Sequence, residues 1–166
     1  MALGSWKRWL LNGALILATF WAVTAWQGRA LVSTQTPAPS FQLPAFSGGS
    51  VALEDLRGRR VLLYFFAPWC SVCDLSIGNL NWVRKLRDEE SVALFAIALS
   101  YSDLQSVEAF LGRNTLNFPV LLGTPELLNA YRIRAFPTVY ALDESGNIDG
   151  ATVGYATTLG LWWWTL

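Results

Sequence analysis

Apolar residues gather in two long blocks in the middle of the chain. Residues 61–67 and 92–99 are nearly unbroken apolar runs, which is typical of central strands buried on both faces of a sheet. Between them, residues 71–88 show helical spacing, with apolar positions at Ile77, Leu80, Val83 and Leu86 or Arg87. Strand, helix and strand in this order predict a right-handed crossover unit.

The second half of the chain predicts further helices and a hairpin. Asp103 is a suitable N-cap for a helix through Leu111. Residues 118–122 form a short apolar run, and residues 125–132 suit one or two helical turns. Segments 138–142 and 148–153 flank a turn-rich stretch and predict a hairpin, and a last helix begins near Tyr155 or Thr157. We expect an α/β fold with a mixed sheet covered by helices.

The N-terminal pattern is different, because residues 9–28 form 20 consecutive uncharged positions. As a helix they match the roughly 30 Å hydrocarbon core of a bilayer. Lys7 and Arg8 precede the run and only Arg29 follows closely, so the positive-inside rule predicts a cytoplasmic N-terminus and an exported remainder. Tryptophans lie towards the two ends, as expected at membrane interfaces, namely Trp6, Trp9, Trp21 and Trp26.

A cleaved signal peptide is the alternative, with Val23-Thr24-Ala25 as a possible cleavage site. Either interpretation exports the rest of the chain. We therefore predict a transmembrane anchor or uncleaved signal at 1–29, a semi-extended linker at 30–40 and a globular domain at 41–166. The Pro-containing linker would reach on the order of 30 Å from the bilayer.

The amino-acid composition excludes several kinds of catalytic and metal site. The chain has 166 residues, no His and two Cys, so Ser-His and Cys-His nucleophile pairs, imidazole metal sites and a complete four-ligand zinc site are excluded. Residues 30–166 carry 9 basic and 12 acidic residues, a net charge of −3. This acidic balance argues against nucleic acid as a partner.

The candidate chemistry lies in Cys70-Ser71-Val72-Cys73, at the junction of the first buried strand and the long helix. A helix N-terminus favours the thiolate form of Cys70, and Cys73 follows one turn later, where it can resolve a mixed disulfide. Three other interpretations remain: half of an intermolecular zinc site, a static disulfide, or a Cu(I) site of two thiolates. The spacing favours redox exchange.

These residues resemble a known family. Trp69-Cys70-Ser71-Val72-Cys73, with Phe136-Pro137-Thr138 opening a later strand, resembles the thioredoxin fold with its active-site loop and cis-proline. Residues 53–63 and 118–122 are similar to TlpA/ResA-like membrane-anchored thiol-disulfide oxidoreductases. The resemblance covers roughly residues 38–155 and implies a thioredoxin-like sheet flanked by helices.

The resemblance also implies roles. Cys70 would be the nucleophile, Cys73 the resolving thiol, Trp69 the flanking ring and Pro137 the cis-proline facing the disulfide. It implies a reductase of exported protein disulfides, recharged by a transmembrane electron donor of the DsbD kind. The domain would then be periplasmic, on the inner (cytoplasmic) membrane. No cofactor or metal is expected.

Two departures from the family leave the proton acceptor for Cys73 open. Thioredoxins have an acidic residue beneath the active site where this chain has Tyr64, and ResA-like reductases have one where this chain has Ser76. Asp74 neighbours Cys73 but is expected to face solvent, and Glu54 is a possible substitute from the preceding loop.

Other functions stay open. The cysteines could serve a disulfide oxidant or isomerase, or a metallochaperone or adaptor without turnover, whereas the lack of a Pro-x-x-x-Thr-x-x-Cys pattern disfavours a peroxidase. Two further clusters suit structural roles. A final helix would turn at least one ring of Trp162-Trp163-Trp164 onto the sheet, with the membrane interface as the alternative, and residues 57–60 suit a solvated turn or a basic docking patch.

Overall fold

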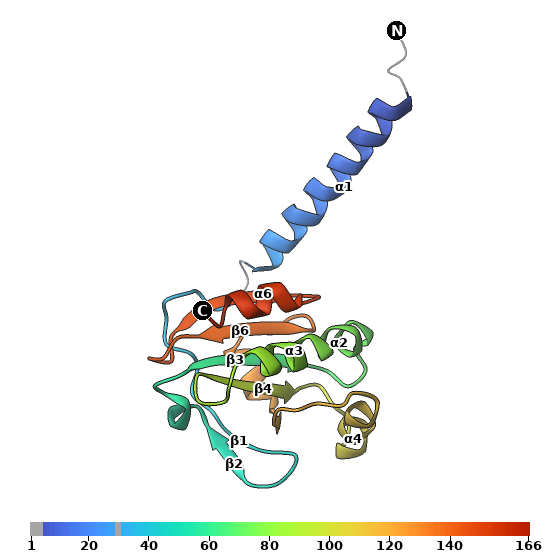
Figure 1. Cartoon of the computed structure of the whole chain (residues 1–166). Helices are drawn as coiled ribbons and strands as arrows, with labels where there is room; N and C mark the ends of the chain where they lie inside the picture. Colours follow the sequence, from blue (N-terminus) through green and yellow to red (C-terminus); the bar gives the residue numbers. More distant parts are fainter. Residues whose placement is uncertain (1–4, 29–30) are drawn as a thin grey trace.

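The two apolar runs form the middle of a five-stranded sheet. The computed structural model describes residues 5–28 and 31–166, and in the first helix the side chains of residues 6–19 and 22. The sheet has the order β5-β4-β3-β6-β7, with β3 parallel to β4, β4 parallel to β5, and β6 antiparallel to β3 and β7 (Figure 1). The strands are β3 (Arg60–Phe66), β4 (Val92–Ala98), β5 (Val120–Leu122), β6 (Thr138–Leu142) and β7 (Ile148–Val153).

Helices follow the predicted positions. They are α1 (Ser5–Gly28), α2 (Ser71–Ser76), α3 (Gly78–Leu86), α4 (Leu104–Arg113), α5 (Pro125–Ala130) and α6 (Thr158–Trp163). Asp103 caps α4 by accepting the backbone N–H of Ser106, and Thr157 caps α6 by accepting that of Gly160. The predicted α/β fold with a mixed sheet is confirmed.

Alternation along the strands builds two cores, one on each face of the sheet. On β3, Leu62, Tyr64 and Phe66 point into the core beneath α2, α3, α4 and α6. Val61, Leu63 and Phe65 point into the other core, which the N-terminal segment, η1 (Leu53–Leu56) and α5 cover. A strand that alternates between two cores has no polar face, which explains the unbroken apolar runs.

The predicted long helix is divided. α2 ends at Ser76 and α3 starts at Gly78, with Ile77 between them in helical backbone geometry. Ile77, Leu80 and Val83 are fully buried, as the helical spacing predicts, but Leu86 is 61% exposed. Leu86 therefore does not continue the apolar face of this helix.

The segment predicted as a linker lies against the domain. Leu31 is buried in the second core. The backbone N–H of Gln35 donates to the Ile148 carbonyl at 2.6 Å, and Pro37 bridges to Asn147. A short hairpin follows, β1 (Gln42–Pro44) paired with β2 (Ser50–Ala52), which the sequence pattern does not predict. Residues 31–40 are docked rather than extended as a free tether.

α1 contains the uncharged run and extends away from the sheet in Figure 1. Within the part of the chain that the structure describes, no helix is long and apolar enough to cross a membrane. The anchor at 1–29 therefore stays a prediction. The side chains of Trp21, Trp26 and Arg29 and of residues 23–25 lie outside the described ones.

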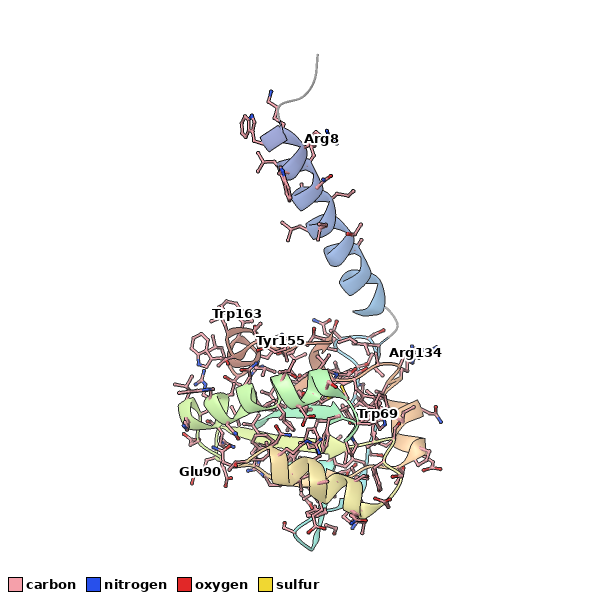
Figure 2. All side chains as sticks on the ribbon, turned by 90° about the vertical axis from the view of Figure 1, so that its right-hand side faces the viewer. Arg8, Trp69, Glu90, Arg134, Tyr155 and Trp163 are labelled. Atoms are coloured by element: carbon pink, nitrogen blue, oxygen red, sulfur yellow. The ribbon has the colours of Figure 1, made fainter. Side chains whose placement is uncertain are left out.

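The C-terminal tryptophans pack onto the sheet domain. Trp162 and Trp164 contact the core that contains Tyr64, and the Trp164 ring lies over Gly150 of β7, where a Cβ atom would meet Nε1 at 2.9 Å. Trp163 is 68% exposed and lies at the surface in Figure 2. The expectation that at least one ring turns inward is confirmed.

The basic cluster of residues 57–60 has structural contacts. Arg60 pairs with Asp149 at 2.8 Å and donates to the carbonyl oxygen of Trp164 at 3.1 Å. Arg59 donates to the Glu89 carbonyl oxygen at 3.0 Å. Arg60 thus links β3, β7 and the C-terminal turn. Residues 57–60 therefore make structural contacts in addition to forming the expected solvated turn.

Candidate active site

Cys70 and Cys73 lie at the junction between β3 and α2. Cys70 is the N-cap residue, with extended backbone angles, and Cys73 lies in the first turn. The Cys73 backbone N–H lies 3.0 Å from the Cys70 carbonyl oxygen and 3.2 Å from Cys70 Sγ. The buried strand β3 ends at Phe66, and Pro68 lies in the turn that follows it, so the sequence places the first sulfur at the start of the helix.

The two thiols differ in exposure. Both are free, and Cys70 is 7% exposed whereas Cys73 is fully buried. Burial raises the pKa of Cys73 far above its usual range, and a hydrogen bond and the charge of Cys70 raise it further, while hydrogen bonds from the Ala67 backbone and Tyr64 lower it. Cys73 is therefore a neutral thiol at physiological pH.

Trp69, the residue before Cys70 in the sequence, lies at the surface (Figure 2). It is 68% exposed, yet its indole N–H donates to the Ser100 carbonyl oxygen at 2.9 Å. The ring also meets Phe136 edge-on, with centroids 5.8 Å apart. Two contacts thus hold an exposed aromatic ring in place beside the first sulfur.

Pro137 lies beside the end of β3. The Phe136–Pro137 peptide bond is cis, as the resemblance implies. Phe65 pairs with Thr138 in antiparallel register, which places Pro137 next to Phe66, just before the turn that carries Cys70. The Pro137 carbonyl oxygen accepts the backbone N–H of Gly154 at 2.8 Å.

Two hydroxyl groups meet beneath Cys73. Tyr64 Oη and Ser76 Oγ lie 2.6 Å apart, and Tyr64 also donates to the Cys73 carbonyl oxygen at 3.4 Å. Both side chains are fully buried. Burial raises the pKa of Tyr64 well above its usual range, so its hydroxyl stays protonated.

The acidic candidates lie elsewhere. Asp74 pairs with Arg113 at 3.3 Å and accepts a hydrogen bond from Asn114 at 2.6 Å. Glu54 belongs to η1, whose buried leucines pack in the core on the opposite face of the sheet from Cys73. The structure therefore brings neither carboxylate to the resolving thiol.

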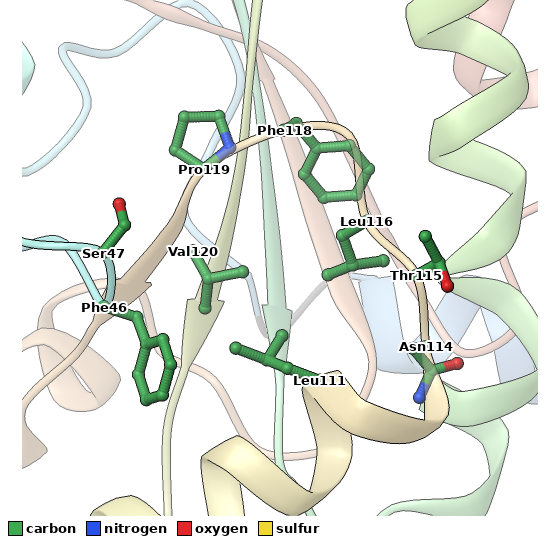
Figure 3. A pocket seen from close by; sticks show the side chains of 9 residues that line it. All are labelled: Phe46, Ser47, Leu111, Asn114, Thr115, Leu116, Phe118, Pro119 and Val120. Carbon is green, nitrogen blue, oxygen red and sulfur yellow. The ribbon is translucent and has the colours of Figure 1, made fainter.

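Two pockets lie near this end of the domain. One, of about 330 Å³, is lined by residues that include Ser100, which holds Trp69, and Gly123. The other, of about 350 Å³, lies between the β1–β2 connection, α4 and β5 (Figure 3). Phe46, Leu111 and Val120 give it an apolar lining. Among the described residues, no group of three or more His, Cys, Asp or Glu is placed to hold a metal ion.

A family model matches most of the chain. The model described as AhpC/TSA family covers residues 34–151. The chain belongs to the AhpC/TSA family. The match includes the cysteines, Tyr64, Ser76 and the cis-proline segment, so it spans the whole candidate site.

Relatives of this AhpC/TSA protein include thioredoxin-like proteins and oxidoreductases. The chain is 31% identical over 160 residues to the thioredoxin-like protein YneN of Bacillus subtilis, covering 91% of this chain and 92% of that protein. It is 29% identical over 130 residues to the thiol-disulfide oxidoreductase ResA of Geobacillus kaustophilus, covering 78% and 74% of the two chains. The resemblance drawn from the sequence motifs is confirmed.

Solved structures agree. StoA from Bacillus subtilis matches with a TM-score of 0.69 at 28% identity, covering 78% of this chain and 98% of that one. A putative thiol:disulfide interchange protein DsbE from Chlorobium tepidum matches with a TM-score of 0.70 at 25% identity, covering 75% and 88%. This AhpC/TSA chain therefore has the thioredoxin-like fold.

Sequence reasoning missed three features of the site. It noted Tyr64 and Ser76 separately but not their contact, although a two-residue period on the strand and one helical turn after Cys73 place both on the same core. It missed the contact of Phe136 with Trp69. It also missed Arg113, which donates to the Pro68 carbonyl oxygen at 3.2 Å.

Proposed function

We propose that this protein is a thiol-disulfide oxidoreductase that reduces disulfides of exported proteins through Cys70 and Cys73. The observation that carries the proposal is the 3.2 Å contact between the Cys73 backbone N–H and Cys70 Sγ, in which a sulfur that is 7% exposed and a fully buried thiol share one helical turn. The name of the relative ResA, a thiol-disulfide oxidoreductase, supports the same activity.

Cys70 acts first. Its sulfur already accepts the Cys73 backbone N–H at 3.2 Å, a contact that suits negative charge on an attacking sulfur. The thiolate attacks one sulfur of a client disulfide, forming a mixed disulfide and releasing the other client sulfur. Full burial keeps Cys73 from reacting with the client itself.

Cys73 acts second, and the first reaction activates it. The hydrogen bond and charge of Cys70 are among the causes that raise the pKa of Cys73. Both influences end when Cys70 enters the mixed disulfide and loses its negative charge. The pKa of Cys73 then falls, its thiolate becomes accessible, and it attacks Cys70 Sγ to release the reduced client.

Trp69 and its surroundings form the proposed client surface. The exposed ring offers apolar contact area beside Cys70, and the pocket of about 330 Å³ shares Ser100 with the Trp69 hydrogen bond. An unfolded or extended client segment would place its cystine over Cys70 and a neighbouring side chain at this pocket.

We also propose that residues 1–29 hold the domain at the inner (cytoplasmic) membrane, with the N-terminus cytoplasmic and the domain extracytoplasmic. The uncharged run at 9–28, preceded by Lys7 and Arg8, supports this topology. Each turnover leaves the cysteines oxidised, so electrons must be resupplied, and a transmembrane donor of the DsbD kind fits that need.

The test uses the full-length protein in detergent with a disulfide-bonded protein substrate and a thiol reductant. We expect turnover by the wild type, none by Cys70→Ser, and a trapped mixed disulfide with Cys73→Ser. Full function of Cys70→Ser would instead indicate an adaptor. A reduction potential near −270 mV supports the reducing direction, and one near about −120 mV would make the protein an oxidant.

Location is tested separately. Protease added to spheroplasts should digest the domain while a cytoplasmic marker survives. Protection of the domain until the membrane is lysed would refute the proposed topology.

A further inference from the structure

The Tyr64–Ser76 pair is a polar contact inside an otherwise apolar core. Both residues are fully buried against the core that contains Cys73, and their oxygens lie 2.6 Å apart. A strand that alternates between two apolar cores is more simply filled by Phe at this position, as at Phe66 two residues later. Burying two hydroxyl groups costs free energy, and that cost is offset only if both groups form hydrogen bonds.

The pair lies at the resolving cysteine. Tyr64 Oη is 3.4 Å from the Cys73 carbonyl oxygen, and Ser76 is one helical turn after Cys73. Besides the Ala67 backbone, the groups that shift the pKa of Cys73 are Cys70 and Tyr64. Asp74, on the same helix, is engaged by Arg113 and Asn114.

Neither hydroxyl can act as a base. Burial raises the pKa of Tyr64, and a serine hydroxyl does not ionise in this range. Each can, however, donate one hydrogen bond while accepting another. Because the single Tyr64 proton points to the Cys73 carbonyl oxygen, Ser76 donates the 2.6 Å bond, and Tyr64 can redirect its proton towards Cys73 Sγ while it still accepts from Ser76.

We propose that Tyr64 and Ser76 are positioning residues for the resolving step: Ser76 donates to Tyr64 Oη, and Tyr64 donates to Cys73 Sγ as negative charge develops there. The inference rests on the proposed function and deepens it. A hydrogen bond to a charged acceptor is stronger than one between neutral groups. The pair thus stabilises the Cys73 thiolate by donating a hydrogen bond to it, whereas a carboxylate would act as a base and accept the Cys73 proton.

The step balances as follows. The Cys73 thiol gives its proton to water, and the thiolate electron pair forms the bond to Cys70 Sγ. The bond between Cys70 Sγ and the client sulfur breaks, and the client sulfur leaves as a thiolate that takes a proton from water. The two cysteines lose two electrons, and the client disulfide has gained two.

The experiment separates the two chemical steps with 5,5′-dithiobis(2-nitrobenzoate), an aryl disulfide. The reduced full-length protein should release one coloured thiolate when Cys70 attacks and a second when Cys73 resolves the mixed disulfide. We compare the wild type with Tyr64→Phe and Ser76→Ala. The matched control is Tyr140→Phe, which also removes a fully buried tyrosine hydroxyl but from the opposite core.

We expect Tyr64→Phe to slow the second phase about tenfold, the effect of losing one hydrogen bond to a charged group. Ser76→Ala should slow it by a smaller factor, about threefold, and the first phase should change less than twofold in both. The pH profile of the second phase should also shift upward by about one pH unit in Tyr64→Phe. A purely structural role would not produce that shift.

The outcomes are distinguishable. A second phase in Tyr64→Phe and Ser76→Ala that equals the wild type overturns the inference, as does an equal slowing in Tyr140→Phe. Failure of the wild type to release a second thiolate would instead overturn the proposed function. If Tyr64→Phe does not fold, the small change Ser76→Ala decides the question alone.

Discussion

Cys73 should make the reduced protein lose stability in alkali, and the Cys73→Ala variant isolates this effect. In the unfolded chain this thiol ionises near its ordinary pKa of 9.0, whereas burial keeps it protonated in the folded protein to much higher pH. The stabilisation is therefore fully present below pH 9.0 and is lost as the pH rises from there towards the folded pKa.

The magnitude follows from linkage. One pH unit above 9.0, ionisation lowers the free energy of the unfolded wild-type chain by about 1.4 kcal/mol relative to the same chain with a neutral thiol. Cys73→Ala has no such group. The stability difference between the wild type and Cys73→Ala should thus change by about 1.4 kcal/mol between pH 8 and pH 10, against the wild type.

The assay is urea unfolding of both proteins under reducing conditions at several pH values in this range. Tyr64, Tyr131 and Tyr140 also have raised pKa values, but they are present in both proteins and cancel in the difference. The oxidised wild type is a second control, since its disulfide has no proton to lose. A stability difference that stays constant from pH 8 to pH 10 would refute the buried, neutral Cys73 thiol.

Four further predictions concern packing and helix capping. Gly123→Ala should lower the free energy of unfolding by about 2 kcal/mol, because the new Cβ would lie 2.6 Å from a Leu99 methyl and 3.0 Å from a backbone oxygen. Gly112→Ala in α4 meets open space and should stabilise by about 0.5 kcal/mol in the same thermal denaturation series. Trp164→Ala should lower the free energy of unfolding by about 2 kcal/mol and change the near-UV circular dichroism spectrum. Trp163→Ala, at an exposed position, should change the free energy of unfolding by no more than about 0.5 kcal/mol. Asp103→Ala removes the α4 cap and should cost about 1 kcal/mol by urea unfolding; an unchanged midpoint would show that the cap is unimportant.

Local signals account for what the sequence predicts well. The strands β3 and β4 follow from the nearly unbroken apolar runs at 61–67 and 92–99, and the start of α4 follows from its capping residue, Asp103. The cysteines are found because a strand end, a proline and a helix start are all visible within a few residues. The cis-proline is found through the resemblance, since Pro137 alone would read as the first residue of a strand.

Contacts between distant segments account for what the sequence does not predict. The docking of residues 31–40 depends on partners at Gly146 and Ile148, far along the chain. The three-residue strands β1 and β2 are too short to carry a period. Tyr64 and Ser76 each look like a substitution for an acid, and only the packing of α2 on β3 shows that they bond to each other.

The docked N-terminal segment sets how far the domain can move. Leu31 is already buried against the domain three residues after α1 ends at Gly28, so the domain begins close to the end of α1 in the sequence. With α1 held in a bilayer, as we propose, the domain would stay close to the membrane surface. Its local concentration towards a donor in the same membrane would then be high and nearly constant, while soluble clients would have to diffuse to the membrane to be reduced.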